Sequence, residues 1–210
     1  IILAELTGGT LHILHVSTAG SVELIRRGKE KNIKVTGEAC PHHFLLTDEC
    51  LQTYDSNYKM SPPLRGKKDV AAIIAGLKDN TIDVLCTDHA PHAAEKKLRE
   101  LEQAPNGILG LETFLPLCIH GLIVPGHLTW PQMIEKMTTN PARILRLPGK
   151  GSLMPGMDAD VTVIDPHMKW TIDKNQFKSK SRNTPFHGWE VVGRATMAIV
   201  HGEVRYQLPS

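Results

Sequence analysis

The chain has 210 residues, enough for one sizeable domain with a small appendage. Lys and Arg number 24 against 22 for Asp and Glu, so the sequence lacks the basic field of a nucleic-acid-binding protein. No apolar run approaches the ~18 residues that indicate a membrane span.

Two residue types stand out in the composition. The four cysteines lie far apart without a CxxC pair, which favours reduced thiols in a cytosolic protein over a disulfide framework. The 11 histidines exceed what packing alone needs, and histidine is the commonest metal ligand and a frequent acid–base group. Most of them are still expected to be ordinary surface or core residues.

The apolar pattern predicts alternating helices and strands. Helices are predicted at residues 1–7, 21–31 and 67–79, and short buried strands at 11–16, 35–39 and 82–86. This alternation is typical of a parallel α/β layer. Three strands are too few to close an eight-stranded (β/α)8 barrel, and the chain opens inside an amphipathic helix without Met. We therefore expect further strands upstream.

The residue pattern changes after about residue 148, where the alternation of helices and strands ends. Glycine and proline punctuate the segment that follows, and short β-type runs occupy residues 160–164, 191–200 and 203–206. We predict an α/β fold whose first part, residues 1–148, is a piece of a (β/α)8 TIM-type barrel. Residues 149–210 are predicted to form a small β appendage.

Polar side chains follow two of the predicted strands. Asp88, His89 and His92 lie in the loop after the third strand, and His15 ends the first. Reactive side chains of parallel barrels sit at the C-terminal strand ends, and carboxylates and imidazoles are preferred metal ligands. The alternatives are a solvated loop for residues 87–92 and a hydrogen-bonded core histidine for His15.

Three further segments carry weaker signals. His42 and His43 are adjacent, so their side chains point in different directions. One is expected to contact residues that bind a metal, and the other to pack in the core. The stiff loop at residues 59–65 is either a connector or a site loop. Residues 104–113 form a glycine-rich turn that enters a helix, where free backbone N–H groups suit a polar ligand. His12 is expected to be structural.

Taken together, these segments resemble class I dihydroorotases of the amidohydrolase superfamily. The similar motifs are HVST (15–18), GEACPHH (37–43), SPPLR (61–65), TDHAPH (87–92), PNGILGLET (105–113), NPARIL (140–145), GSLMPGMDADVTVID (151–165) and RNTPFHG (182–188). They span nearly the whole chain. TDHAPH is fairly specific for dihydroorotases, whereas the segment at 151–165 marks the β-sandwich domain of the superfamily, so the appendage is expected to be part of a β-sandwich.

The resemblance implies roles for individual residues. His15 would be a zinc ligand, and Asp88 a metal-bound carboxylate that is also the catalytic acid and base. The implied substrate contacts are His92, Ser61, Asn106 and Gly107. Ser61 stands where the family usually has Asn, and Ile108 replaces an aromatic residue common in that loop.

Several family motifs have no counterpart in this sequence. They are the HxHxR motif of the first strand, the bridging lysine or aspartate, and the fifth-strand histidine. His15 and Asp88 alone cannot make a catalytic zinc site, which needs three protein ligands. We therefore expect this chain by itself to bind zinc (one or two ions in the family) poorly and to be inactive.

For the intact protein the resemblance implies reversible cyclisation of N-carbamoyl-L-aspartate to L-dihydroorotate in pyrimidine synthesis. It implies a cytoplasmic homodimer, with aspartate carbamoyltransferase as a further candidate partner. One alternative is another cyclic-amide hydrolase, of the hydantoinase, dihydropyrimidinase or allantoinase kind. The other is a non-catalytic scaffold, although such relatives typically lose metal ligands and His15 and Asp88 are both present.

Overall fold

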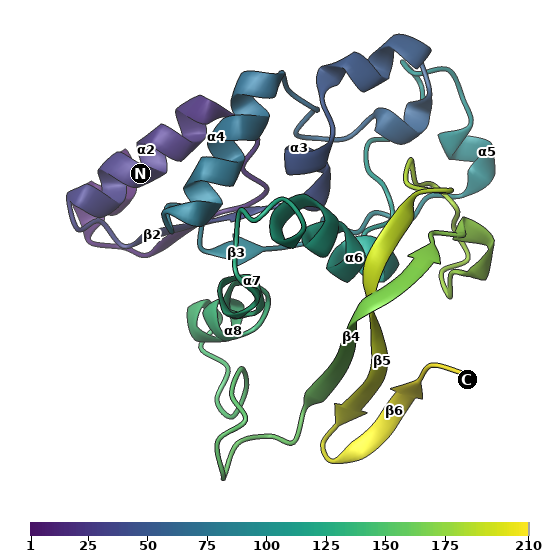
Figure 1. Ribbon diagram of the computed structural model, residues 1–210. Helices are drawn as coiled ribbons and strands as arrows, with labels where there is room; N and C mark the ends of the chain where they lie inside the picture. Colours follow the sequence, from purple (N-terminus) through teal and green to yellow (C-terminus); the bar gives the residue numbers. More distant parts are fainter. Residues whose placement is uncertain (210) are drawn as a thin grey trace.

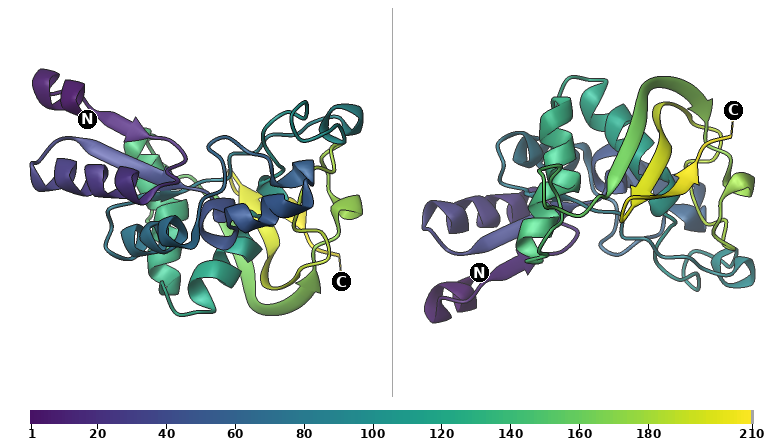
Figure 2. Two further views of the ribbon diagram at one scale, coloured as in Figure 1. Left: turned by 90° about the horizontal axis from the view of Figure 1, so that it is seen from above. Right: turned by 90° about the horizontal axis from the view of Figure 1, so that it is seen from below.

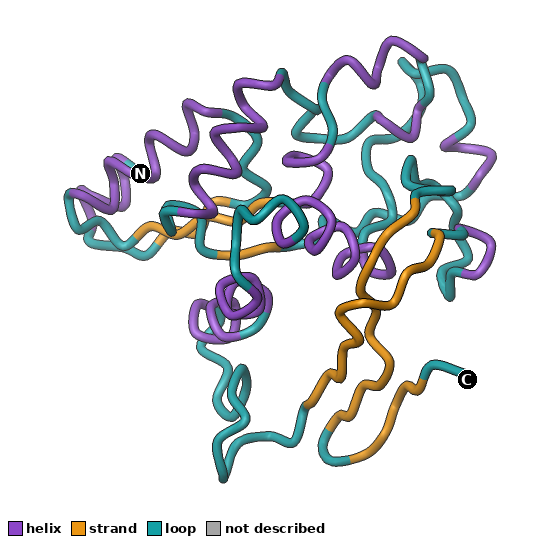
Figure 3. Tube along the Cα trace, in the orientation of Figure 1, coloured by secondary structure: helices purple, strands orange, loops and turns teal. Residues whose placement is uncertain are grey.

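The computed structural model describes residues 1–209. Its strands form two three-stranded sheets, shown in Figure 1 and, as separate groups, in Figure 3. The first sheet is parallel, with the order β1-β2-β3, and the second is antiparallel, with the order β4-β5-β6. The α/β character predicted from the sequence is confirmed.

The elements of the first sheet alternate with helices along the chain. They are α1 (Ile2–Thr7), β1 (Leu11–Ile13), α2 (Ala19–Glu30), β2 (Val35–Ala39), α3 (Pro41–Leu45), α4 (Lys67–Lys78) and β3 (Val84–Leu85). Two 3-10 turns, Asp48–Thr53 and Ser56–Tyr58, lie between α3 and α4. The predicted parallel layer of three strands is therefore present.

Two predicted strands are shorter than expected: the first is cut at its C-terminal end, and the third, predicted at residues 82–86, is cut at both ends. The first was predicted to reach residue 16 but ends at Ile13, because His15 takes a positive φ of 35°. The third ends at Leu85, and Asp88 beyond it has a φ of 47°. Left-handed backbone is incompatible with a continuing strand, so the chain turns away from the sheet at these residues.

Helices α2 and α4 pack together on one face of the parallel sheet (Figure 1). Residues of β2 alternate between the two faces: Val35, Gly37 and Ala39 are buried, and Thr36 and Glu38 are half-buried. A Cβ atom on Gly37 would lie 2.9 Å from Cδ1 of Ile25, so glycine allows α2 to approach the sheet closely. Thr36 and Glu38 consequently face away from these helices.

The remaining helices connect the two sheets. They are α5 (Ala94–Lys97), the 3-10 turn Leu111–Thr113, α6 (Phe114–Cys118), the π-helical turn Ile119–Ile123, α7 (Trp130–Met137) and α8 (Thr139–Ile144). Helix α7 contacts β3, and α6 contacts β5. The second sheet consists of β4 (Val161–Thr171), β5 (Glu190–Val200) and β6 (Glu203–Gln207), with a 3-10 turn at Lys174–Gln176.

Figure 2 shows the two sheets in different parts of the molecule, with helices between them, and a buried core joins the two parts of the chain. One buried cluster combines residues of the first part, such as Leu64, Ile108 and Leu117, with Ile172 and Phe186 of the second. The boundary predicted at residue 148 falls between α8 and β4, where the chain has only turns and bends, and it stays a prediction.

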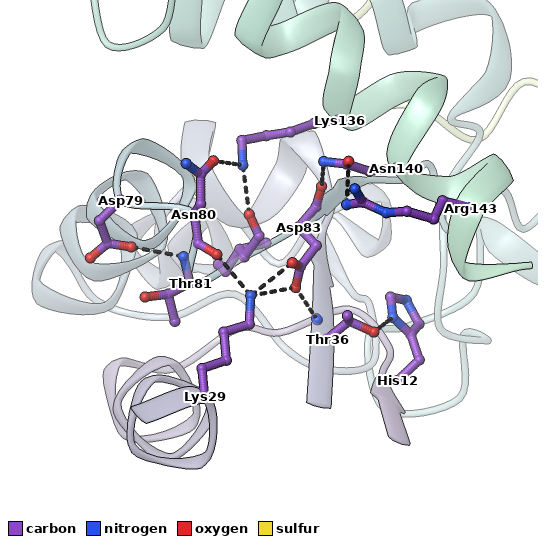
Figure 4. Close-up of polar contacts among 12 residues, drawn as sticks. His12, Lys29, Thr36, Asp79, Asn80, Thr81, Asp83, Lys136, Asn140 and Arg143 are labelled. Carbon is purple, nitrogen blue, oxygen red and sulfur yellow. Dashed lines mark hydrogen bonds and ion pairs between the residues drawn. The ribbon is translucent and has the colours of Figure 1, made fainter. Parts of the chain in front are cut away.

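A polar network fixes the other end of the parallel sheet, where β3 begins (Figure 4). The ammonium group of Lys136 on α7 donates to Oδ1 of Asn80 at 2.9 Å and to the carbonyl of Ile82 at 2.8 Å. Lys29 on α2 donates to both carboxylate oxygens of Asp83, at 2.7 and 2.8 Å. These bonds tie helices from both sides to the start of β3.

Across residues 1–209, no helix combines the length and the apolar character needed to cross a membrane.

Candidate active site

The C-terminal ends of the three parallel strands bring the predicted metal ligands to one edge of the sheet. His15 lies two residues beyond β1, Cys40 directly follows β2, and Asp88 lies three residues beyond β3. Because β2 pairs with both neighbours in parallel, these three ends are adjacent. The structure thus brings His15 and Asp88, which are 73 positions apart (88 − 15), to the same edge, as the sequence predicts.

Glu38 on β2 holds the backbone of His15. One carboxylate oxygen accepts the backbone N–H of His15 at 3.3 Å, and the other lies 3.1 Å from Nε2 of His12. Nδ1 of His12 is in turn 2.7 Å from the hydroxyl of Thr36. His12 therefore holds the carboxylate of Glu38 in place, and that carboxylate contacts the backbone of His15, which gives a physical basis for the expected structural role of His12.

The imidazole of His15 is free to bind a ligand. Its Nδ1 atom is buried and has no hydrogen-bond partner among the described residues. A buried polar atom without a partner costs about 1–3 kcal/mol, so it normally indicates a missing ion, water or chain segment. Imidazole nitrogen in this state suits a metal ion.

His42 and His43, on α3, pack beside His15. Burial lowers the pKa of His42 well below its usual value, and the nearby His43 and His15 act in the same direction. Burial also lowers the pKa of His43 to about 4, opposed by its hydrogen bond to the carbonyl of Pro62. Both imidazoles are consequently neutral near pH 7. The strand end is followed at once by α3, which begins at Pro41, a residue favoured at the first position of a helix.

The loop that carries Asp88 and His92 pairs with the glycine-rich segment. Ala90 N–H donates to the carbonyl of Ile108 at 2.8 Å, and Nε2 of His92 lies 2.8 Å from the carbonyl oxygen of Asn106. That carbonyl can only accept, so Nε2 of His92 carries the proton and Nδ1 is left as an acceptor. His92 and Asn106 are thus brought together as predicted.

Position 107 requires glycine, both for its backbone conformation and for lack of space. Its φ of 107° is unfavourable for other residues, and a Cβ atom there would lie 2.5 Å from Cβ of Ala90. Its N–H donates to the carbonyl of Lys59 at 2.9 Å, which brings the loop containing the exposed Ser61 alongside. Three of the predicted substrate contacts, His92, Asn106 and Gly107, are in mutual contact, and Ser61 lies two residues from that junction.

Asn183 joins these loops, and its role was not predicted. Its side-chain amide donates to the carbonyls of Ala90 at 2.9 Å and Gly107 at 3.2 Å, and its Oδ1 accepts the N–H of His92 at 3.2 Å. The only signal in the sequence was the RNTPFHG segment that contains it. Side-chain partners so distant along the chain have no local pattern.

Lys97 is a second residue that the sequence did not reveal. It belongs to a segment rich in Lys and Glu that is expected to be exposed, yet its side chain is buried. Its ammonium donates to the carbonyls of Pro105 at 2.9 Å and Lys59 at 3.2 Å. Burial lowers the pKa of Lys97 to about 8, and the charge of Lys59 adds to this effect.

Comparison with known proteins identifies relatives along nearly the whole chain. A dihydroorotase of Endomicrobium trichonymphae is 52% identical over 208 residues, which cover 99% of this chain and 49% of that protein. A dihydroorotase of Acetivibrio thermocellus is 50% identical over 204 residues, covering 97% of this chain and 48% of that protein. The chain therefore spans about half the length of the curated relatives that it matches.

Solved structures agree with this relationship. The L-hydantoinase (dihydropyrimidinase) of Arthrobacter aurescens superposes with a TM-score of 0.92 at 30% identity, over 98% of this chain and 47% of that one. The dihydropyrimidinase of Brevibacillus agri superposes with a TM-score of 0.91 at 27% identity, over 98% and 46%. A model of the amidohydrolase family matches residues 5–205. The chain belongs to the amidohydrolase family.

Proposed function

We propose that this chain is the C-terminal part of a dihydroorotase, which interconverts N-carbamoyl-L-aspartate and L-dihydroorotate. The observation that carries the proposal is the position of His15 and Asp88 at the C-terminal ends of β1 and β3, which flank β2 at one edge of the parallel sheet. Dihydroorotases matching at 50–52% identity support this substrate over the hydantoinases and dihydropyrimidinases, which match at 27–30%.

Zinc is the proposed cofactor, and the residues of this chain fit it in part. His15 offers a buried imidazole nitrogen without a partner, and Asp88 offers a carboxylate. A catalytic zinc site needs three protein ligands, so we propose that the rest come from the part of the protein that this chain does not span. When bound, zinc supplies a nucleophilic water near neutral pH and polarises the ring carbonyl.

The residues of this chain would transfer the proton in the reaction and hold the substrate in the correct orientation. In the hydrolytic direction, Asp88 accepts the proton of the attacking water and delivers it to the ring nitrogen as the C–N bond breaks. His92 would contact the substrate through Nδ1, since its Nε2 proton is engaged by Asn106. Ser61 and the backbone of Asn106 and Gly107 would line the same pocket and hold the substrate in place.

The finer architecture belongs to the same proposal. We propose that the parallel sheet is a segment of a (β/α)8 barrel and that residues 149–210 complete a β-sandwich with strands outside this chain. Cytoplasmic location, homodimer formation and association with aspartate carbamoyltransferase are proposed with it. The high TM-scores to chains about twice as long support the architectural part.

The test is ring opening of L-dihydroorotate by the full-length protein, with hydantoin, dihydrouracil and allantoin assayed in parallel. We expect zinc-dependent turnover of dihydroorotate alone, and a loss of at least about 10³-fold in kcat/KM for Asp88→Asn, because the proton carrier is removed. The exposed Asp48→Asn is the matched control and should keep full activity.

Other outcomes would change the proposal in defined ways. Turnover of a different ring would keep the chemistry and assign a hydantoinase-type substrate. Absence of activity on all four rings with zinc supplied would refute the enzyme and leave the non-catalytic scaffold as the better account.

A further inference from the structure

A second cluster of metal-binding side chains lies behind the candidate active site. Cys40, His42 and His43 follow β2, and one donor atom of each lies within 4.8 Å of the others. Their side chains are closed off from solvent, with 0, 2 and 3% of their surface exposed. The cluster is therefore an interior group and not a chance meeting of surface residues.

Both histidines of this cluster present an unsatisfied nitrogen. Nε2 of His42 and Nδ1 of His43 are buried and have no hydrogen-bond partner in the described part of the chain. Leaving two such atoms unpaired costs about 1–3 kcal/mol each. Because both residues are almost fully buried by this chain itself, the missing partner has to be small enough to occupy the interior.

The tautomer of His43 suits a metal ligand. Its Nε2 lies 3.0 Å from the carbonyl oxygen of Pro62, which can only accept, so Nε2 carries the proton. Nδ1 is left with a lone pair that points into the cluster. Histidines that bind metals usually donate their other N–H to a carbonyl or carboxylate in this way.

The end of β3 carries a further thiol, Cys86, which contacts Cys40 but lies outside the group of three residues whose donor atoms are within 4.8 Å of one another. Sγ of Cys86 lies 3.2 Å from Sγ of Cys40, so the two thiols are in direct contact. Two sulfur and two imidazole donors form the set that tetrahedral structural zinc prefers. Buried water would satisfy the two nitrogens without using the thiols, and a disulfide would leave both nitrogens unpaired.

We propose that Cys40, His42 and His43 bind one thiophilic divalent cation, zinc, in addition to any ion bound through His15 and Asp88, and that Cys86, which contacts Cys40, completes the site as its fourth ligand. Binding replaces the two thiol protons, which are released to solvent, by two metal–sulfur bonds. The ion would join the ends of β2 and β3 and, through His43, the loop at Pro62. This inference goes beyond the proposed function, because it assigns an ion to residues that the proposed reaction does not use.

Cobalt(II) titration of the metal-stripped full-length protein tests the proposal. His15 and Asp88 contain no sulfur, so a thiolate-to-cobalt charge-transfer absorption that depends on Cys40 and Cys86 reports on the new site. We expect this absorption to saturate at one equivalent, to disappear in Cys40→Ser, and to weaken with at least tenfold lower affinity in His43→Gln. It should persist in His15→Ala and Asp88→Asn, and in the matched control Cys50→Ser.

The same titration can overturn the inference. If the folded protein with its thiols reduced shows no charge-transfer absorption at saturating cobalt, the site does not exist. Absorption that survives in both Cys40→Ser and Cys86→Ser would place the thiolate elsewhere. Should Cys40→Ser fail to fold, Cys86→Ser decides the matter. Since absorption is measured and not turnover, the result stands whether or not the protein opens dihydroorotate.

Discussion

Glu38 connects a strand to the backbone of a proposed metal ligand. His15 sits at a φ of 35°, a conformation that costs a non-glycine residue about 1–3 kcal/mol and needs support from its surroundings. The carboxylate of Glu38 supplies that support by accepting the N–H of His15 while its second oxygen contacts His12. A neutral amide at this position cannot accept from both partners.

We therefore predict that Glu38→Gln lowers kcat/KM and zinc affinity of the full-length protein about 10–100-fold, the range for residues that orient metal ligands. Metal content by atomic absorption and steady-state kinetics measure this effect. The exposed Glu30→Gln, a change of the same kind on α2, should have wild-type values. Wild-type zinc affinity in Glu38→Gln would show that His15 is held without it.

The buried ammonium of Lys97 predicts a pH dependence of stability. Its pKa is about 8 in the folded protein, below the unfolded value of about 10.4, so between these values the unfolded chain binds more protons. The free energy of unfolding should then rise with pH from about 8 to 10.4, with a slope of at most about 1.4 kcal/mol per pH unit. Below pH 8 both states are protonated and this contribution is flat.

Urea unfolding of Lys97→Met between pH 7.5 and 10.5 measures this contribution, which we expect to be absent in the variant. Lys96→Met is the matched control, since the neighbouring side chain is exposed, and it should retain the rise. An unchanged pH profile in Lys97→Met would mean that Lys97 keeps a normal pKa in the folded protein.

At the level of elements, three loops form one unit through a single side chain. Asn183 precedes β5 and contacts the loop after β3 at Ala90 and His92, and the glycine-rich turn at Gly107. Lys97 ties that turn to the loop at Lys59. Loops positioned in this way hold the proposed substrate contacts without belonging to any strand.

Asn183→Ala removes three hydrogen bonds from a buried position, and we predict a loss of about 2–4 kcal/mol in the free energy of unfolding. We also expect kcat/KM to fall at least about 10²-fold, because misplacement of substrate contacts is costly. Urea unfolding and kinetics give the two values. Asn175→Ala, in the exposed turn Lys174–Gln176, controls for loss of an amide and should change neither.

At the scale of the whole molecule, the parts of the chain before and after residue 148 share one core cluster. Phe186, from the second part, is buried together with Ile108 and Leu117 from the first. Gly193 on β5 lies so close to α6 and the following turn that a Cβ atom there would be 2.3 Å from Cδ1 of Ile119. We expect packing this close to make the antiparallel sheet unfold together with the rest of the chain.

Phe186→Ala should lower the free energy of unfolding by about 3–5 kcal/mol, the usual cost of deleting a buried aromatic ring. If the core is shared, amide hydrogen exchange should quicken in α6 as well as in β4 and β5. Tyr54→Ala, which removes an exposed ring, is the control and should leave exchange unchanged. Faster exchange confined to residues 149–209 would show two independent units.

Much of the fold and the central pair of the candidate site followed from local sequence patterns. Short apolar runs separated by helical periodicity predicted the three parallel strands, because burial on both faces selects such runs. Polar residues directly after those runs predicted that His15 and Asp88 lie at the same edge of the sheet, since parallel strands end at the same edge. The sequence placed the ends of these strands too late, since a positive φ has no side-chain signature at His or Asp.

Only the tertiary structure decided which polar groups find partners. Asn183 bonds to residues 76 and 93 positions away, Lys97 is buried despite its charge, and the nitrogens of His42 and His43 are left unpaired. Sequence determines the periodicity that forms helices and strands, because that depends on near neighbours. Desolvation and hydrogen bonding depend on contacts between distant segments, so they exist only once the chain has folded.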